Sequence, residues 1–240
     1  SALNIPVLQY AEAVGELTRH YTTIAISGSH GKSTTTSLLG LILTRAGLDP
    51  TVIVGTNLRE FGPPGGEAIG INFRAVKSKY LVLEADEWGK SVHHYTPYIA
   101  IVTNIDKEHL DIYKNFAGIV KGFVEYLRNV RSGGVIVANA GSKGVQEAIR
   151  QLPITNYQLP VHVIWYNKDR FTKHKLGIPG KHNQENAEAA WQAWNIIARS
   201  EHISPTRAKK IARDVFKNYH GSWRRFERLS VGGRNKLSVV

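Results

Sequence analysis

Short apolar runs rich in β-branched residues alternate along this chain with longer segments of helical period. This alternation predicts an α/β domain, in which a mainly parallel β-sheet is flanked by helices. The candidate strands are Thr22 to Ile26, Thr51 to Val54, Tyr80 to Glu84, Tyr98 to Thr103, Gly134 to Ala138 and Val161 to Tyr166. In open α/β sheets, ligands bind outside the carboxyl ends of the strands. The residues that follow these runs are therefore the first place to look for a site.

Four helices are predicted between and after the strands. Leu38, Leu41 and Ile42 share one face of a helix that should end near Gly47. The clearest apolar stripe begins at Phe116 and has Asn115 as a plausible N-cap. Two further helices are expected at about Asn183 to Arg199 and Pro205 to Tyr219, the latter with proline in its first turn, and a loop at Glu60 to Gly66.

Composition limits the partners. The 240 residues include 31 Lys and Arg against 19 Asp and Glu, a net charge of +12, which favours anionic partners such as nucleotides or phosphorylated metabolites. Nucleic acid is not expected, because the basic residues are scattered and do not alternate with aromatics. The absence of cysteine excludes disulfides and thiolate metal sites. With neither a long apolar run nor a signal-peptide pattern, we expect a cytoplasmic protein without membrane contact.

Residues Gly28-Ser29-His30-Gly31-Lys32-Ser33, here called the phosphate loop, separate the first strand from a helical pattern. Glycines in such a turn let backbone N–H groups approach phosphate oxygens, and the helix N-terminus that follows favours negative charge. Lys32 can reach the β- and γ-phosphates, the Ser33 hydroxyl can bind Mg²⁺, and Thr34, next in the helix, is a further candidate for nucleotide binding. The strict motif has glycine where this chain has Ile26. The pattern predicts an ATP and Mg²⁺ site.

Three other segments supply candidate partners for the phosphate loop. Glu84 ends a predicted strand and is the first metal candidate, whereas Asp86 and Glu87 fit helix capping or a solvated surface equally well. His109 lies in an acid-rich loop, where a structural role is as compatible as a metal or phosphate role. Asn183 and Asn186 lie on one helical face and could bind adenine through their carboxamides, although N-capping by Asn183 explains the pattern more simply.

Taken in order, these segments resemble the Mur ligase family, which joins amino acids to a UDP-muramoyl acceptor in peptidoglycan synthesis. The resemblance implies that Lys32, Glu84 and His109 are catalytic. It also implies that Ser33 and Glu84 bind one Mg²⁺ and that His109 helps to bind a second. Asn183 and Asn186 would contact adenine, and Arg225 would approach the nucleotide. The branch that joins L-alanine to UDP-N-acetylmuramate fits best, and the branch that recycles a short peptide fits nearly as well.

The same resemblance suggests how the chain is divided. Residues 1–20 would be the exit segment of a missing N-terminal UDP-binding domain, 21–222 the central ATP-binding domain, and 223–240 the start of a truncated C-terminal domain. Two alternatives to an ATP-dependent carboxylate–amine ligase stay open. One is a Mur-like nucleotide-binding module without ligase activity of its own, and the other is a different P-loop ATPase or kinase. The oligomeric state is not predicted.

Overall fold

The fold was analysed in a computed structural model, which describes residues 7–61, 71–86, 88–107, 115–153, 161–167, 175–222, 228–231 and 234–237. For 88–90 and for the last two segments only the backbone is described. The statements below concern these residues.

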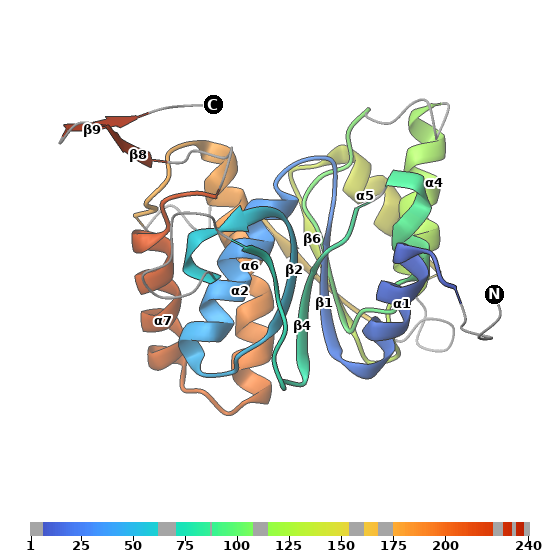
Figure 1. The fold of residues 1–240 in the computed structure, drawn as a ribbon. Helices are drawn as coiled ribbons and strands as arrows, with labels where there is room; N and C mark the ends of the chain where they lie inside the picture. The colour runs from blue at the N-terminus through green and yellow to red at the C-terminus, as the bar shows by residue number, and fades with distance from the viewer. Residues whose placement is uncertain are drawn as a thin grey trace.

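Within the described residues, a seven-stranded sheet forms the centre of the molecule, in the order β3-β2-β4-β1-β5-β6-β7 (Figure 1). Its strands are β1 (Thr22–Ser27), β2 (Thr51–Leu58), β3 (Ile71–Arg74), β4 (Tyr80–Glu84), β5 (Ile99–Val102), β6 (Val135–Asn139) and β7 (His162–Tyr166). All pairings are parallel except that of β3 with β2. The mainly parallel sheet predicted from the sequence is confirmed, and β3 is added at its edge.

Helices cover both faces of this sheet (Figure 1). On one face lie α2 (Lys32–Ala46), α6 (Lys181–Ser200) and α7 (Pro205–Asn218), and on the other lie α1 (Tyr10–His20), α4 (Phe116–Leu127) and α5 (Lys143–Arg150). The short turns η1 (Arg59–Phe61) and η2 (Trp88–His94) and the hairpin of β8 (Arg228–Val231) and β9 (Arg234–Leu237) complete the described elements.

The hydrophobic core has two parts because strand side chains alternate between the faces. In β1, Ile24 and Ile26 belong to the cluster with α2, α6 and α7, whereas Ala25 belongs to the cluster with α1, α4 and α5. Trp194 of α6 is fully buried, and its Nε1 donates a hydrogen bond to the Ala208 carbonyl of α7 at 3.0 Å. Both faces of the sheet are therefore packed, which fixes the strand ends where the candidate site lies.

Most helix ends agree with the sequence predictions. Asn115 caps α4, accepting a hydrogen bond from the Gly118 amide at 2.8 Å, and Gly47 ends α2 in a left-handed conformation with φ of 84°. Asn183, in contrast, is not an N-cap. Helix α6 begins at Lys181 after Gly180, so Asn183 lies within its first turn. The predicted loop at Glu60 to Gly66 also needs correction, because Glu60 and the buried Phe61 belong to η1; residues 62–66 lie outside the described residues.

Candidate nucleotide site

The phosphate loop connects β1 to α2 through two glycines with positive φ. Gly28 has φ of 130° and Gly31 has φ of 82°, values that residues with a Cβ rarely adopt. Space is equally restrictive at Gly31, where a Cβ would lie 2.1 Å from Oδ1 of Asn186. Glycine is thus required at this position by both backbone conformation and packing.

The first turn of α2 presents backbone amides to the loop. The amide of Thr35 donates to the Gly31 carbonyl at 3.0 Å, and helix geometry offers no intrahelical acceptor to the amides before it, including those of Ser33 and Thr34. The positive end of the helix dipole lies at the same place. This turn is therefore suited to an anion such as a phosphate group.

Glu84 and Ser33 form the centre of the candidate metal site. Ser33 Oγ donates to Glu84 Oε1 at 2.9 Å, and the Gly55 amide of β2 donates to Glu84 Oε2 at 2.6 Å. The sheet explains the meeting, because Glu84 at the end of β4 pairs in register with Ile26 of β1, two residues before the phosphate loop. The site thus draws on the ends of β1 and β4 and on the middle of β2.

This pair of oxygens fits Mg²⁺. In an octahedral ion with ligand distances of ~2.0–2.1 Å, adjacent ligands lie ~2.9 Å apart, which is the separation of Ser33 Oγ and Glu84 Oε1. Within the described residues no three His, Asp or Glu side chains are grouped as a metal site. Mg²⁺ usually keeps several waters and shares substrate phosphates, so two protein ligands are compatible with it.

Lys32 crosses the phosphate loop. Its Nζ donates to the Gly28 carbonyl at 2.8 Å and lies 3.9 Å from Oδ1 of Asp86, a mainly exposed side chain. The exposure of Asp86 fits the solvated alternative, and its carboxylate also lies within ion-pair distance of the loop lysine. Glu87 lies outside the described residues.

Asn183 and Asn186 lie at the start of α6, beside the phosphate loop. Both are buried, and Asn186 contacts Gly31 while its Nδ2 donates to Asn183 Oδ1 at 3.3 Å. The side-chain Nδ2 of Asn183 in turn donates to the Pro179 carbonyl at 2.5 Å. These carboxamides hold the start of α6 against the loop, and contact with adenine stays a prediction.

Two predicted site residues, His109 and Arg225, lie outside the described residues, so their roles also stay predictions. Sequence reasoning assigned no role to Gly55, Thr103 or Asn104, although all three lie beside Glu84 or the phosphate loop. The position of Thr103 and Asn104 after the β5 run was a usable signal. Gly55 interrupts an apolar run, which ended the predicted strand at Val54 although β2 continues to Leu58.

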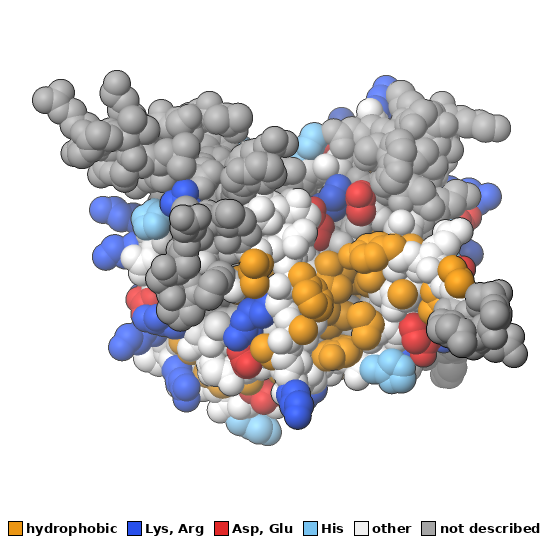
Figure 2. Space-filling view, viewed as in Figure 1, with side chains coloured by type: hydrophobic (Ala, Val, Ile, Leu, Met, Phe, Trp, Pro, Cys, Tyr) orange, Lys and Arg blue, Asp and Glu red, His pale blue; other side chains and the backbone are white. Residues whose placement is uncertain are grey.

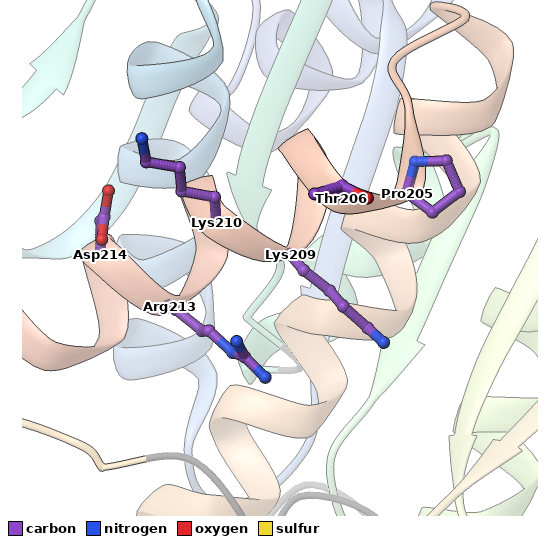
Figure 3. A pocket seen from close by; sticks show the side chains of 6 residues that line it. All are labelled: Pro205, Thr206, Lys209, Lys210, Arg213 and Asp214. Carbon is purple, nitrogen blue, oxygen red and sulfur yellow. The ribbon is translucent and has the colours of Figure 1, made fainter.

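The basic residues of α7 form a separate feature. A shallow pocket of about 310 Å³ is lined by Pro205, Thr206, Lys209, Lys210, Arg213 and Asp214. Lys209 and Arg213 extend to the same side of α7, whereas Lys210 points away from them (Figure 3). Glu201, four residues before α7, bonds to Tyr80 at the start of β4, whereas Glu84 is at the end of β4. The start of α7 therefore lies at the opposite end of the strands from Glu84. The pocket is therefore distinct from the candidate site.

Charge is spread over one face of the molecule. Lys and Arg side chains are distributed around its outline, and apolar side chains gather near its centre (Figure 2). Among the described helices, none combines the length and the apolar character that crossing a membrane requires.

Comparison with known proteins shows which family has this fold and these motifs. The Mur ligase middle domain family matches residues 26–194, which include the phosphate loop, Glu84 and both asparagines. The chain belongs to the Mur ligase family. This Mur ligase chain is 33% identical to the UDP-N-acetylmuramate–L-alanine ligase of Borreliella afzelii, over 94% of the chain and 50% of that protein. It is 35% identical to the enzyme of the same name from Caldanaerobacter subterraneus, with the same coverage of 94% and 50%.

Solved structures share the fold of this Mur ligase chain. UDP-N-acetylmuramate–alanine ligase MurC from Thermotoga maritima has a TM-score of 0.68 at 20% identity, covering 91% of the chain and 49% of that structure. The UDP-N-acetylmuramate:L-alanyl-gamma-D-glutamyl-meso-diaminopimelate ligase from Neisseria meningitides has a TM-score of 0.66 at 22% identity, covering 91% and 72%. The chain spans about half the length of the curated relatives described above.

Proposed function

We propose that the protein is an ATP-dependent carboxylate–amine ligase of peptidoglycan synthesis. It would activate the carboxylate of UDP-N-acetylmuramate and join it to L-alanine, with a short peptide as the second candidate. The names of the sequence relatives support L-alanine, and that of the Neisseria structure supports the peptide. ATP and Mg²⁺ are the implied cosubstrate and cofactor, and the cytoplasm, where ATP is available, is the expected location.

One observation carries this proposal: the Ser33 hydroxyl and the Glu84 carboxylate meet directly beside the first turn of α2. An oxygen pair of Mg²⁺ dimensions thus lies next to backbone amides suited to phosphate. Lys32 adds a cation within the same loop. This combination serves phosphoryl transfer, where catalysis consists of positioning and of stabilising charge.

The proposed reaction has two steps. A carboxylate oxygen of the acceptor attacks the γ-phosphorus of ATP, the bond from that phosphorus to the β,γ-bridging oxygen breaks, and ADP leaves. The amine nitrogen then attacks the acyl carbon, phosphate is expelled, and the nitrogen loses a proton to give the amide. When bound, Mg²⁺ supplies positive charge between the carboxylate and the triphosphate.

Each site residue has a part in this scheme. Lys32 would contact the γ-phosphate, and Ser33 with Glu84 would hold one Mg²⁺, oriented by the Gly55 amide. The amides of Gly31 and of the first α2 turn would hold the β-phosphate. His109 as a ligand of a second Mg²⁺, Asn183 and Asn186 at adenine, and Arg225 near the nucleotide complete the proposal.

Phosphate release tests the function. The protein in its natural length is incubated with ATP, Mg²⁺ and UDP-N-acetylmuramate, and either L-alanine or the tripeptide is added in separate reactions. The proposal expects release that depends on both the acceptor and one of the amines. Release with ATP alone would favour a different P-loop ATPase, and nucleotide binding without any release would favour a Mur-like module without ligase activity.

A further inference from the structure

Asn104 follows β5 and lies beside the phosphate loop. Strand β5 pairs with β1, and Val102 is in register with Ser27, so the segments that leave the two strands start side by side. The side chain of Asn104 bonds to the backbone of His30 twice: its Oδ1 accepts from the His30 amide at 2.7 Å, and its Nδ2 donates to the His30 carbonyl at 3.2 Å. A carboxamide can make this paired contact because it carries both a donor and an acceptor.

The backbone around Asn104 continues the contact. The Asn104 carbonyl accepts from the Ser29 amide at 3.1 Å, and the Asp106 amide donates to Ser29 Oγ at 2.9 Å. Thr103 Oγ1 donates to the His30 carbonyl at 2.6 Å. Both Ser29 and His30 are thus bonded to the segment that follows β5, through backbone as well as side-chain groups.

The close approach of the two segments leaves little freedom to rearrange. A Cβ at Gly28 would lie 2.2 Å from Thr103 Oγ1 and 2.8 Å from the Asn104 carbonyl oxygen. On the other side of the loop, Asn186 contacts Gly31. The phosphate loop is therefore packed between the segment after β5 and the start of α6.

We propose that Asn104 is a positioning residue that sets the phosphate loop in its binding conformation before the nucleotide arrives. Because the amides of Ser29 and His30 point to Asn104, the phosphate contacts come from the later amides, at Gly31 and in the first turn of α2. A loop ordered in advance loses less conformational freedom when it binds a ligand. The inference rests on the proposed nucleotide site and adds a determinant of its affinity.

The experiment compares Asn104→Ala with Asn129→Ala. Asn129 is a matched control, because its Nδ2 also donates to a backbone carbonyl, that of His93 at 2.8 Å, in the part of the structure formed by η2 and the end of α4. The dissociation constant of Mg²⁺–ATP is measured by calorimetry on the protein in its natural length. Loss of two hydrogen bonds that order the loop should raise it by about tenfold in Asn104→Ala. Asn129→Ala should leave it unchanged.

Amide hydrogen exchange gives a readout that does not require nucleotide. In the unsubstituted chain, the amides of Ser29 and His30 should exchange slowly. In Asn104→Ala the His30 amide loses its side-chain acceptor and should exchange at least about tenfold faster, while the core strands keep their protection. Asn104→Asp, which retains an acceptor for the His30 amide, should keep much of that protection and serves if Asn104→Ala does not fold. A His30 amide that exchanges no faster in Asn104→Ala, or that loses its protection fully in Asn104→Asp, would overturn the positioning role.

The two arms separate failure of this inference from failure of the proposed function. If the unsubstituted chain does not bind Mg²⁺–ATP, the proposed function fails, while the exchange of Ser29 and His30 still tests the role of Asn104 in shaping the loop. If the unsubstituted chain binds nucleotide and Asn104→Ala binds it equally well, the positioning role is wrong and the nucleotide site stands.

Discussion

The hydroxyl oxygen of Ser33 lies 2.9 Å from a carboxylate oxygen of Glu84, although 51 positions separate the two residues in the chain. They meet because α2 begins directly after the phosphate loop, which follows β1, and because β4 is the neighbour of β1 in the sheet. The contact depends on strand order, and it places an ionisable oxygen beside a hydroxyl at a helix N-terminus.

Replacing Glu84 by glutamine should lower turnover by about a hundredfold or more, because a preorganised charge at the proposed metal site is lost. Glutamine has nearly the same size, its single oxygen can still accept from the Gly55 amide and its NH2 group can donate to Ser33 Oγ, so the melting temperature should change little. Turnover measured over a range of Mg²⁺ concentrations, together with the melting temperature, checks both statements. Near-normal turnover of the Glu84→Gln variant at low Mg²⁺ would show that Glu84 is not a catalytic residue.

Replacing Lys32 by alanine should also lower turnover by about a hundredfold, since the cation nearest the proposed γ-phosphate is removed. The exposed basic residues of α7 provide the control. Lys209→Ala removes the same charge from α7, which is not part of the candidate site. It should leave turnover within about twofold of the unsubstituted protein, because solvent and salt screen charges that are far from the reacting groups. Equal losses in the two variants would mean that net charge, and not loop geometry, controls the reaction.

Gly31→Ala tests the contact between the phosphate loop and α6. The substitution adds a Cβ at a φ of 82° and places it 2.1 Å from Asn186 Oδ1, so we expect a loss of stability of about 2 kcal/mol or more together with weaker nucleotide binding. Gly47→Ala at the other end of α2 has a φ of 84° but meets nothing within 4 Å, and should cost about 1 kcal/mol. Denaturant titration measures the free energy of unfolding of both variants. Equal losses of stability would show that the Asn186 side chain moves aside without an energetic cost.

A pH-dependent contribution to stability is expected from Glu201. Hydrogen bonds from Lys79, at 2.6 Å, and from Tyr80 hold the pKa of Glu201 below its ordinary value of 4.5. Since this pKa is lowered in the folded state, the contribution is present above the ordinary value and is lost as pH falls through the lowered one. Glu201→Gln should therefore destabilise by about 1 kcal/mol near neutral pH and by less in acid.

The measurement for Glu201 is the free energy of unfolding at several pH values between about 3 and 7. Glu147→Gln is the control: Gln151 and Arg150 lower the pKa of Glu147, but that side chain lies on an exposed helix surface. Its replacement should change stability less than that of Glu201 at every pH. A Glu201 effect that stays constant from neutral to acid pH would contradict the assigned bonds.

Local pattern was enough to predict much of this fold. The apolar run of β4 and the turn at Gly28 to Gly31 are encoded in consecutive residues, and the structure has them where the sequence placed them. β3 could not be predicted, because a four-residue edge strand with Phe73 half exposed carries almost no periodic signal.

The candidate site was predictable only where one residue type implies one chemistry. Lys32, Ser33 and Glu84 were identified because a motif or a strand end pointed to them. The pairing of Asn104 with His30, and of the Gly55 amide with Glu84, depends on which strands become neighbours. Strand order is set by packing over the whole sheet, so single residues do not reveal it. Asn183 was misjudged as an N-cap because α6 starts two residues earlier than its pattern suggested.

Helix α6 runs from one end of the strands to the other, so local opening at its first turn and at its last turn should be coupled. Its 20 residues span about 30 Å, from the turn where Asn186 contacts Gly31 to the end where Glu201 bonds Tyr80 and Lys79. Because half of its residues are buried, from Asn183 in the first turn to Ala198 in the last, a ligand that stabilises its first turns also disfavours openings that release its last turn. Nucleotide at the phosphate loop should thus slow amide exchange around Ser200, far from any atom the ligand contacts.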